Sequence, residues 1–119
     1  MSLKRPGLID FMQGSINWKG GQVLWFEEEL NVEGSIDSQI DILREDLIAV
    51  RFGDSVILDL SWCPEFNPAG QFILTVVRSI HKTSEDWDNP VLEIKFRDLG
   101  QFIPNLNQAV ETADRLASA

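Results

Sequence analysis

The chain has little of what catalysis and covalent cross-linking depend on. Its 119 residues include one cysteine, Cys63, one histidine, His81, and no tyrosine. A single cysteine excludes an internal disulfide framework and is typical of a reducing compartment, so we expect a cytoplasmic protein. No apolar stretch approaches the ~20 residues that cross a bilayer, and Met1–Asp10 has no secretory core, so neither a membrane span nor a leader is expected.

Basic residues are also scarce. Ten Lys and Arg stand against 19 Asp and Glu, which gives a net charge of −9 and a pI near 4.4. This balance argues against a nucleic-acid partner, because phosphate contacts need an excess of Lys and Arg. The 44% hydrophobic content and the length predict a single globular domain over residues 1–119, with residues 1–7 as a disordered tail.

The middle of the chain predicts an antiparallel hairpin. Two apolar segments, Ser55–Trp62 and Gln71–His81, flank Cys63–Gly70, which contains two prolines, an Asn and a Gly and therefore suits a turn. Alternation fixes the register, because a slip of one residue would turn the leucines to the wrong face. The expected pairs are Trp62–Phe72, Leu60–Leu74 and Leu58–Val76 on one face and Ile57–Val77, Asp59–Thr75 and Ser61–Ile73 on the other.

Further strands are less clearly marked. Pro90–Arg97 alternates apolar and charged residues and predicts a third strand. Gln22–Val32 contains four adjacent apolar residues, which suit either a buried strand or a helical turn. Leu47–Phe52 could continue a preceding helix or form a strand that turns at Gly53-Asp54. We favour a strand for both segments.

Two helices complete the expected fold. Apolar residues recur at three- and four-residue spacing from Ile36 to Leu47 and predict an amphipathic helix over Ser35–Arg44. A second helix is expected from about Pro104, after a separate turn over Asp98–Ile103. The predicted fold class is therefore α+β: an antiparallel sheet of three to four strands (a β-meander), with a middle helix and a C-terminal helix packed on it.

The sequence shows no arrangement that is typical of catalysis. In the expected register Cys63 and His81 lie about ten residues or ~33 Å apart along paired strands, too far for a catalytic dyad. Spacings typical of metal ligands, phosphate loops, dinucleotide sites and nucleophile elbows are all missing. Asp59 and Glu65 could form an acid–base pair, but a carboxylate on the polar face of a strand is far commoner. We therefore expect no enzyme, cofactor or metal.

Surface features instead predict a protein-binding role. The chain has four tryptophans, and the alternation places Trp62 in the core. Trp87 lies in a loop among acidic residues, which is typical of a hot spot for a basic partner. Alternatively, it folds back over the sheet edge. The candidate partner-binding residues are Trp87, Asp86, Asp88, Glu65, Asp59, Glu27, Glu28 and Glu29.

Three short motifs carry a resemblance to a known group of proteins. They are Asp-x-x-Trp at Asp59–Trp62, Pro-Glu-Phe-Asn-Pro-Ala-Gly at Pro64–Gly70 and Asp-Trp-Asp-Asn-Pro at Asp86–Pro90. With the helices before and after them, they resemble the small acidic immunity proteins encoded beside bacterial polymorphic and contact-dependent-inhibition toxins. The resemblance implies a stoichiometric inhibitor that covers a toxin domain, commonly a nuclease, whose basic surface attracts a protein of negative charge.

Two other functions stay open. The chain could be a cytosolic accessory module that binds through an open sheet edge or through a mixed face of Ile57, Asp59 and Val77. It could also bind or convert a small ligand with dispersed carboxylates, which a deep pocket lined by two or more acids would favour.

Overall fold

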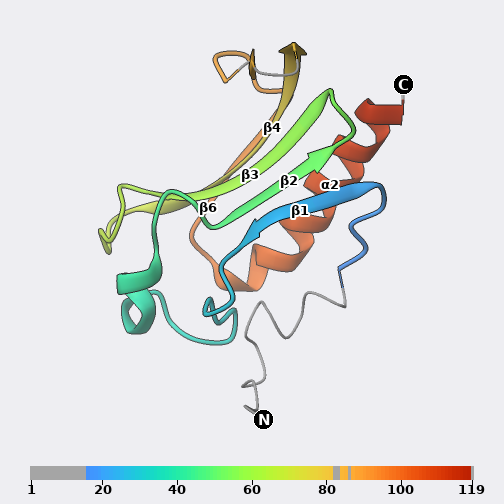
Figure 1. The fold of residues 1–119 in the computed structure, drawn as a ribbon. Coiled ribbons are helices and arrows are strands. Elements are labelled where there is room, and N and C mark those ends of the chain that lie inside the picture. Colours follow the sequence, from blue (N-terminus) through green and yellow to red (C-terminus); the bar gives the residue numbers. More distant parts are fainter. Residues whose placement is uncertain (1–15, 82–83, 86, 119) are drawn as a thin grey trace.

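The computed structural model describes residues 16–81, 84–85 and 87–118. Its elements follow one another along the chain in Figure 1. They are β1 (Gly21–Phe26), the 3₁₀ helix η2 (Asp37–Ile42), β2 (Ile48–Phe52), β3 (Val56–Cys63), β4 (Gln71–His81), β5 (Ser84–Glu85), β6 (Leu92–Phe96), the 3₁₀ helix η3 (Leu99–Gln101) and α2 (Phe102–Ser118).

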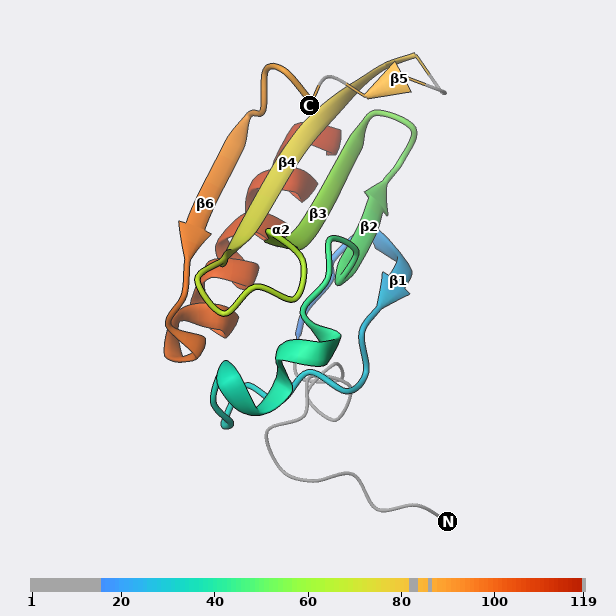
Figure 2. The same cartoon turned by 90° about the vertical axis from the view of Figure 1, so that its left-hand side faces the viewer.

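The strands form one antiparallel sheet with a helix against one face. The order is β1-β2-β3-β4, β6 pairs with the first half of β4, and the two-residue β5 pairs with its far end. Figure 2 shows α2 behind the sheet, and no α-helix of the described chain lies over the opposite face. The α+β class with an antiparallel sheet is confirmed. The expected three to four strands were too few, because β1, β2 and the two-residue β5 all pair into the sheet.

The predicted register of the β3–β4 hairpin is confirmed pair by pair. All six expected pairs occur, including Trp62 opposite Phe72 and Asp59 opposite Thr75. Leu58, Leu60 and Trp62 are fully buried beneath α2. Register is this well determined by sequence because only one alternating set of side chains can enter the core.

An aromatic cluster closes the core at the end where β3 ends and β4 begins. Phe72 lies 4.9 Å from Trp62 and 5.6 Å from Phe102 between ring centroids, both edge to face. The Trp62 indole donates to the Asn67 carbonyl at 2.9 Å, so the buried N–H is satisfied by the turn it supports. A Cβ on Gly70 would lie 2.6 Å from the same indole nitrogen, and this close approach requires a glycine.

The prediction of an α-helix over Ser35–Arg44 is wrong. In its place is the short 3₁₀ helix η2, interrupted at Gln39, where φ is −133° and ψ is 24°. Gln39 is buried, and its side-chain amide bonds the backbone of Asn31 and Ser35 at 2.8–3.0 Å. These local bonds compete with helical ones. Of the apolar residues that predicted a helix, Leu43 and Leu47 are buried in the irregular segment that follows η2.

The C-terminal helix is confirmed, although it starts two residues earlier than expected. It begins at Phe102, so Pro104 falls in its first turn, where a missing N–H breaks no helical bond. The preceding turn is η3, and the Asp98 side chain accepts from the Gly100 N–H at 2.8 Å. The helix buries Phe102, Leu106, Ala109, Val110 and Ala113. No helix in the described ranges is long and apolar enough to cross a membrane.

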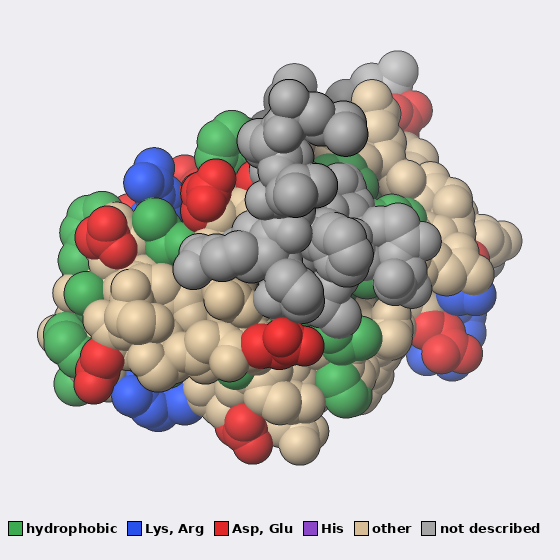
Figure 3. Space-filling view, turned by 90° about the horizontal axis from the view of Figure 1, so that it is seen from below, with side chains coloured by type: hydrophobic (Ala, Val, Ile, Leu, Met, Phe, Trp, Pro, Cys, Tyr) green, Lys and Arg blue, Asp and Glu red, His purple; other side chains and the backbone are tan. Residues whose placement is uncertain are grey.

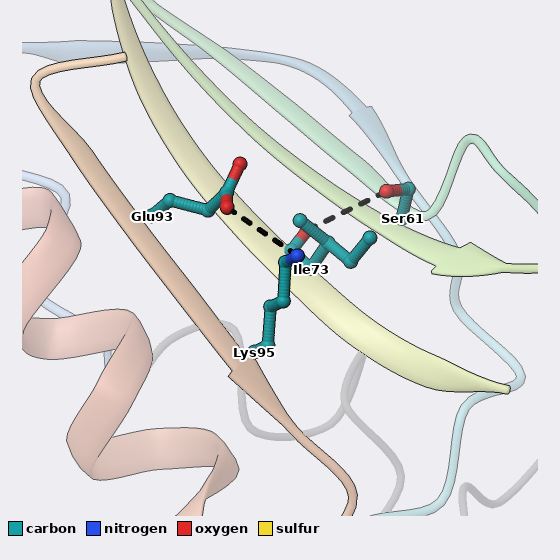
Figure 4. A network of polar contacts seen from close by, with 4 residues as sticks. All are labelled: Ser61, Ile73, Glu93 and Lys95. Atoms are coloured by element: carbon teal, nitrogen blue, oxygen red, sulfur yellow. Dashed lines mark hydrogen bonds and ion pairs between the residues drawn. The ribbon is translucent and has the colours of Figure 1, made fainter.

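The sheet face opposite α2 is mixed in character. On it, Lys95 Nζ lies 3.7 Å from Glu93 Oε1, and Ser61 Oγ lies 3.5 Å from the Ile73 carbonyl (Figure 4). Ile57 and Val77 also belong to this face, yet they are 6% and 0% exposed. Of the Ile57, Asp59 and Val77 surface expected for an accessory module, only Asp59 is therefore open to a partner.

Two leucines with opposite exposure test this account of the core. Leu58→Ala should lower the free energy of unfolding by about 2–5 kcal/mol, because Leu58 is fully buried and its removal leaves a cavity. Leu24→Ala, at a leucine that is 50% exposed, should change it by less than ~1 kcal/mol. Urea denaturation measures both, and equal losses would contradict the observed packing.

Candidate functional site

A β-bulge in β1 determines where Trp25 points. Val23 pairs with Val50, but Trp25 pairs with Ala49, so Leu24 is an extra residue in β1. In a regular strand Trp25 would lie opposite Ile48, on the face that α2 covers. The bulge instead places Trp25 on the opposite face, where its side chain is 48% exposed.

Three cross-strand neighbours then form one row of this face. Trp25 on β1 is paired with Ala49 on β2, which is paired with Asp59 on β3. Directly opposite residues on neighbouring strands have Cβ atoms about 4.5–5.5 Å apart. Because Ala49 is small, a hollow remains between the indole ring and the carboxylate.

This hollow is a pocket of about 380 Å³, which we call the Trp25 pocket. It is lined by Trp25, Arg44, Asp46, Ile48, Ala49 and Asp59. A second pocket of about 230 Å³ shares Trp25, and we call it the glutamate pocket. It is lined by Trp25, Phe26, Glu27, Glu28 and Glu29. Trp25 therefore borders two hollows, and each of them is also lined by acidic residues.

The segment between η2 and β2 supplies the far wall of the Trp25 pocket. Its backbone continues alongside β3: the Trp62 N–H donates to the Arg44 carbonyl at 2.9 Å, and the Leu47 N–H donates to Leu60 at 3.0 Å. The Trp25 indole N–H donates to the Asp46 carbonyl at 2.9 Å. This bond fixes one edge of the ring and holds its orientation.

Charge in the Trp25 pocket is unevenly distributed. Burial, together with the smaller effect of the negative charge of Asp46, raises the pKa of Asp59 from 3.8 to about 6. The other charged wall is Arg44, whose Nε is buried and has no hydrogen-bond partner among the described residues. A carboxyl group with a raised pKa in a pocket marks a candidate functional site.

The structure brings together some of the predicted site residues. Asp59 lines the Trp25 pocket, and Glu27, Glu28 and Glu29 line the glutamate pocket beside it. Glu65 is close by but is used structurally, since its Oε1 accepts from the Glu45 N–H at 3.0 Å. The Asp59–Glu65 acid–base pair that the sequence allowed is not a feature of either pocket.

The predicted loop site lies elsewhere. Trp87 and Asp88 are exposed, with Trp87 at 49%, and Asp86 lies outside the described residues. The β5–β6 connection that carries them is at the upper end of the sheet in Figure 2, whereas η2 and the start of β2 are at the lower end. Trp87 therefore cannot share one small site with Asp59, and a hot spot at Trp87 would be a second, separate interface.

The sequence did not predict Trp25, Arg44 or Asp46 as residues of the site. Trp25 belongs to a run of four apolar residues in which no alternation shows which side chains face solvent. That run was the available signal, since four successive apolar residues in a strand next to glutamates are compatible with a bulge. Arg44 is the last residue of the expected helix and Asp46 follows it, so the helix prediction gave no indication that both lie beside β3.

Acidic side chains are not confined to the two pockets. Seen from below, they are spread over the visible face with hydrophobic side chains between them (Figure 3). Within residues 16–81, 84–85 and 87–118, no three His, Cys, Asp or Glu side chains are grouped so that they could hold a metal ion. What distinguishes the Trp25 region is the combination of an exposed aromatic ring with carboxylates on both sides.

Comparison with known proteins gives little guidance. The sequence matches no family model and no solved structure. It is similar to the ubiquitin conjugation factor E4 ufd-2 of Caenorhabditis elegans, with 27% identity over 92 residues. This match covers 65% of the chain and 9% of the worm protein, so the chain spans less than a tenth of that protein's length. The function must therefore be argued from the site.

The raised pKa of Asp59 predicts a pH dependence of stability. The folded state holds this proton more tightly than the unfolded state, so the free energy of unfolding should fall as the pH rises from 3.8 to about 6. At about 1.4 kcal/mol per pKa unit, the upper limit of this contribution is about 3 kcal/mol. Asp59 keeps some contact with solvent, which reduces it.

Denaturation of the wild-type protein and of Asp59→Asn at several pH values between 4 and 7 isolates this contribution. The difference in stability between the two should change over this range, with the variant gaining relative to the wild type as the pH rises. A difference that stays constant with pH would show that Asp59 titrates at its ordinary pKa.

Proposed function

We propose that this chain is a non-catalytic cytoplasmic binding protein, an immunity protein that neutralises a basic toxin domain by stoichiometric binding. The observation that carries the binding role is Trp25, a half-exposed tryptophan between two pockets lined with carboxylates. Tryptophan is enriched at the energetic centres of protein interfaces because it buries a large area with little loss of side-chain entropy.

The chemistry of the site favours a basic protein surface as partner. Asp46, Asp59 and Glu27–Glu29 border the ring, and the whole chain carries a net charge of −9. A partner with Lys and Arg around an apolar recess would be attracted over long range and would match these charges on contact. Nuclease domains carry such a surface where they hold phosphates, and the resemblance to immunity proteins supports a nuclease-type toxin as the partner.

Binding at this site needs no catalysis and no cofactor from the chain. The toxin would be neutralised because its substrate groove is covered. The carboxylates around Trp25 would occupy the places of the phosphate charges of its substrate. The pocket with two carboxylates also favours a second candidate function, the binding of a small cationic molecule. A protein partner explains the glutamate pocket as well, which a small molecule in the Trp25 pocket would not reach.

Two tryptophans provide a matched test of this function. The partner to use is the toxin domain encoded beside the gene for this chain. The wild type should form a 1:1 complex with it and protect cells that express it. Trp25→Ala should weaken the complex by about 30-fold or more, the loss expected for a hot spot worth at least ~2 kcal/mol. Calorimetry measures the affinity, and survival of co-expressing cells measures protection.

Trp87→Ala is the control, because Trp87 is exposed to the same extent, 49% against 48%, at the other end of the sheet. It should bind within about threefold of the wild type. Cells that die despite the wild-type protein would reject the immunity function. A loss at Trp87 with none at Trp25 would move the interface to the β5–β6 loop.

A further inference from the structure

The Trp25 pocket has features of a receptor for one basic side chain. Resting on the proposed function, we propose that it receives a single arginine or lysine side chain of the protein partner, with the cationic group beside Asp59 and Asp46 and the alkyl stem against the Trp25 ring. The Trp25 pocket would then hold the central residue of the interface, and the glutamate pocket would add negative potential around it.

The walls suit a cation with an apolar stem. The Trp25 ring is held by its indole N–H at the Asp46 carbonyl, and about half of the side chain remains exposed. A cation near an indole face is attracted by the negative charge of the ring, and an alkyl stem packs on the same surface. Asp46 and Asp59 also line the Trp25 pocket. Glu27, Glu28 and Glu29 add negative potential from the neighbouring glutamate pocket.

The size of the pocket limits what can enter it. At about 380 Å³ it lies at the small end of the ~300–1,000 Å³ that ligand pockets span. Its floor is Ala49, whose methyl group leaves the space between Trp25 and Asp59. A larger aliphatic side chain at this position would fill the hollow without removing any of its charges.

Arg44 provides a test of whether the ligand carries a positive or a negative charge. Arg44 lines the same pocket, and its guanidinium carries the opposite charge to the two carboxylates. An incoming cation is repelled by Arg44 and attracted by Asp59, whereas an incoming anion would show the reverse. Removing the charge of Arg44 should therefore tighten the binding of a cation and weaken that of an anion.

A bound cation also brings a further positive charge close to the carboxyl of Asp59. The charged groups on the elements packed against Asp59 are Arg44 and Asp46 from the segment before β2, and Arg51 from β2 itself on the same face. On the other side Asp59 is paired with the uncharged Thr75 of β4. A cation in the pocket should lower the pKa of Asp59, so binding near pH 6 should release a proton and strengthen as the pH rises.

A peptide probe tests the pocket without any toxin. The probe is an acetylated, amidated Gly-Gly-Arg-Gly-Gly peptide, and its control replaces arginine by citrulline, which keeps the shape and loses the charge. Binding is followed by NMR shifts of the Trp25 indole at low salt. The arginine peptide should bind at least about tenfold more tightly than the citrulline peptide at pH 7, and its affinity should fall severalfold at pH 5.

Three variants locate the binding. Asp59→Asn and Ala49→Ile should each weaken the arginine peptide by about tenfold or more, the first by removing charge and the second by filling the pocket. Arg44→Gln should tighten it. Val91→Ala, at a residue that is 40% exposed and lines neither pocket, should leave it unchanged. Equal affinity for the two peptides would overturn the inference, and so would weaker binding by Arg44→Gln.

The two proposals fail in different ways. A toxin domain that binds through Trp25 while the arginine peptide shows no preference would leave the proposed function standing and reject the basic side chain as the anchor. An arginine peptide that binds as expected to a chain that retains no toxin domain would reject the immunity function and make this a site for small cations.

Discussion

One extra residue in β1 governs the functional surface of this protein. Because Leu24 is inserted opposite β2, the side chains after it change faces, and Trp25 leaves the side of the sheet that α2 covers. Phe26 then returns to the core, where its ring lies 6.0 Å from Trp18. A strand without this bulge would turn the indole toward the face that α2 covers, and Trp25 would not border the two acidic pockets.

The pocket also depends on a segment that is neither helix nor strand. The residues between η2 and β2 are held by backbone bonds to β3 on one side and by the Trp25 indole on the other. Because of these bonds, the wall that carries Arg44 and Asp46 does not depend on a helix for its position. Glu65 adds a further bond to this segment through the Glu45 N–H. A site built this way is preorganised before any partner arrives, which limits the entropy lost on binding.

The sequence predicted the parts of the fold that depend on alternation. The β3–β4 register followed from one buried row of leucines ending in Trp62, and the C-terminal helix from its apolar stripe. The prediction of the middle helix was wrong, because apolar residues three to four positions apart can also be buried by a short 3₁₀ helix and the irregular segment after it. The buried Gln39 amide also forms bonds that compete with helical ones.

The candidate site was predictable only in part. Asp59 and the three glutamates were identified as candidates because charge is visible in a sequence. Trp25 was not, because the run of four apolar residues around it is compatible with a bulge but does not show where the bulge lies, which only the pairing with β2 determines. The Trp87 loop had the composition of a binding site, but the structure sets it at the other end of the sheet from the two pockets.

The most direct measurement is an NMR titration of the indole N–H signals of the four tryptophans with the basic partner domain. The account predicts that the Trp25 signal shifts or broadens as the complex forms, while the signal of the fully buried Trp62 stays in place. A complex in which the Trp25 indole is unaffected would contradict the claim that the bulged face of β1 is where this protein binds.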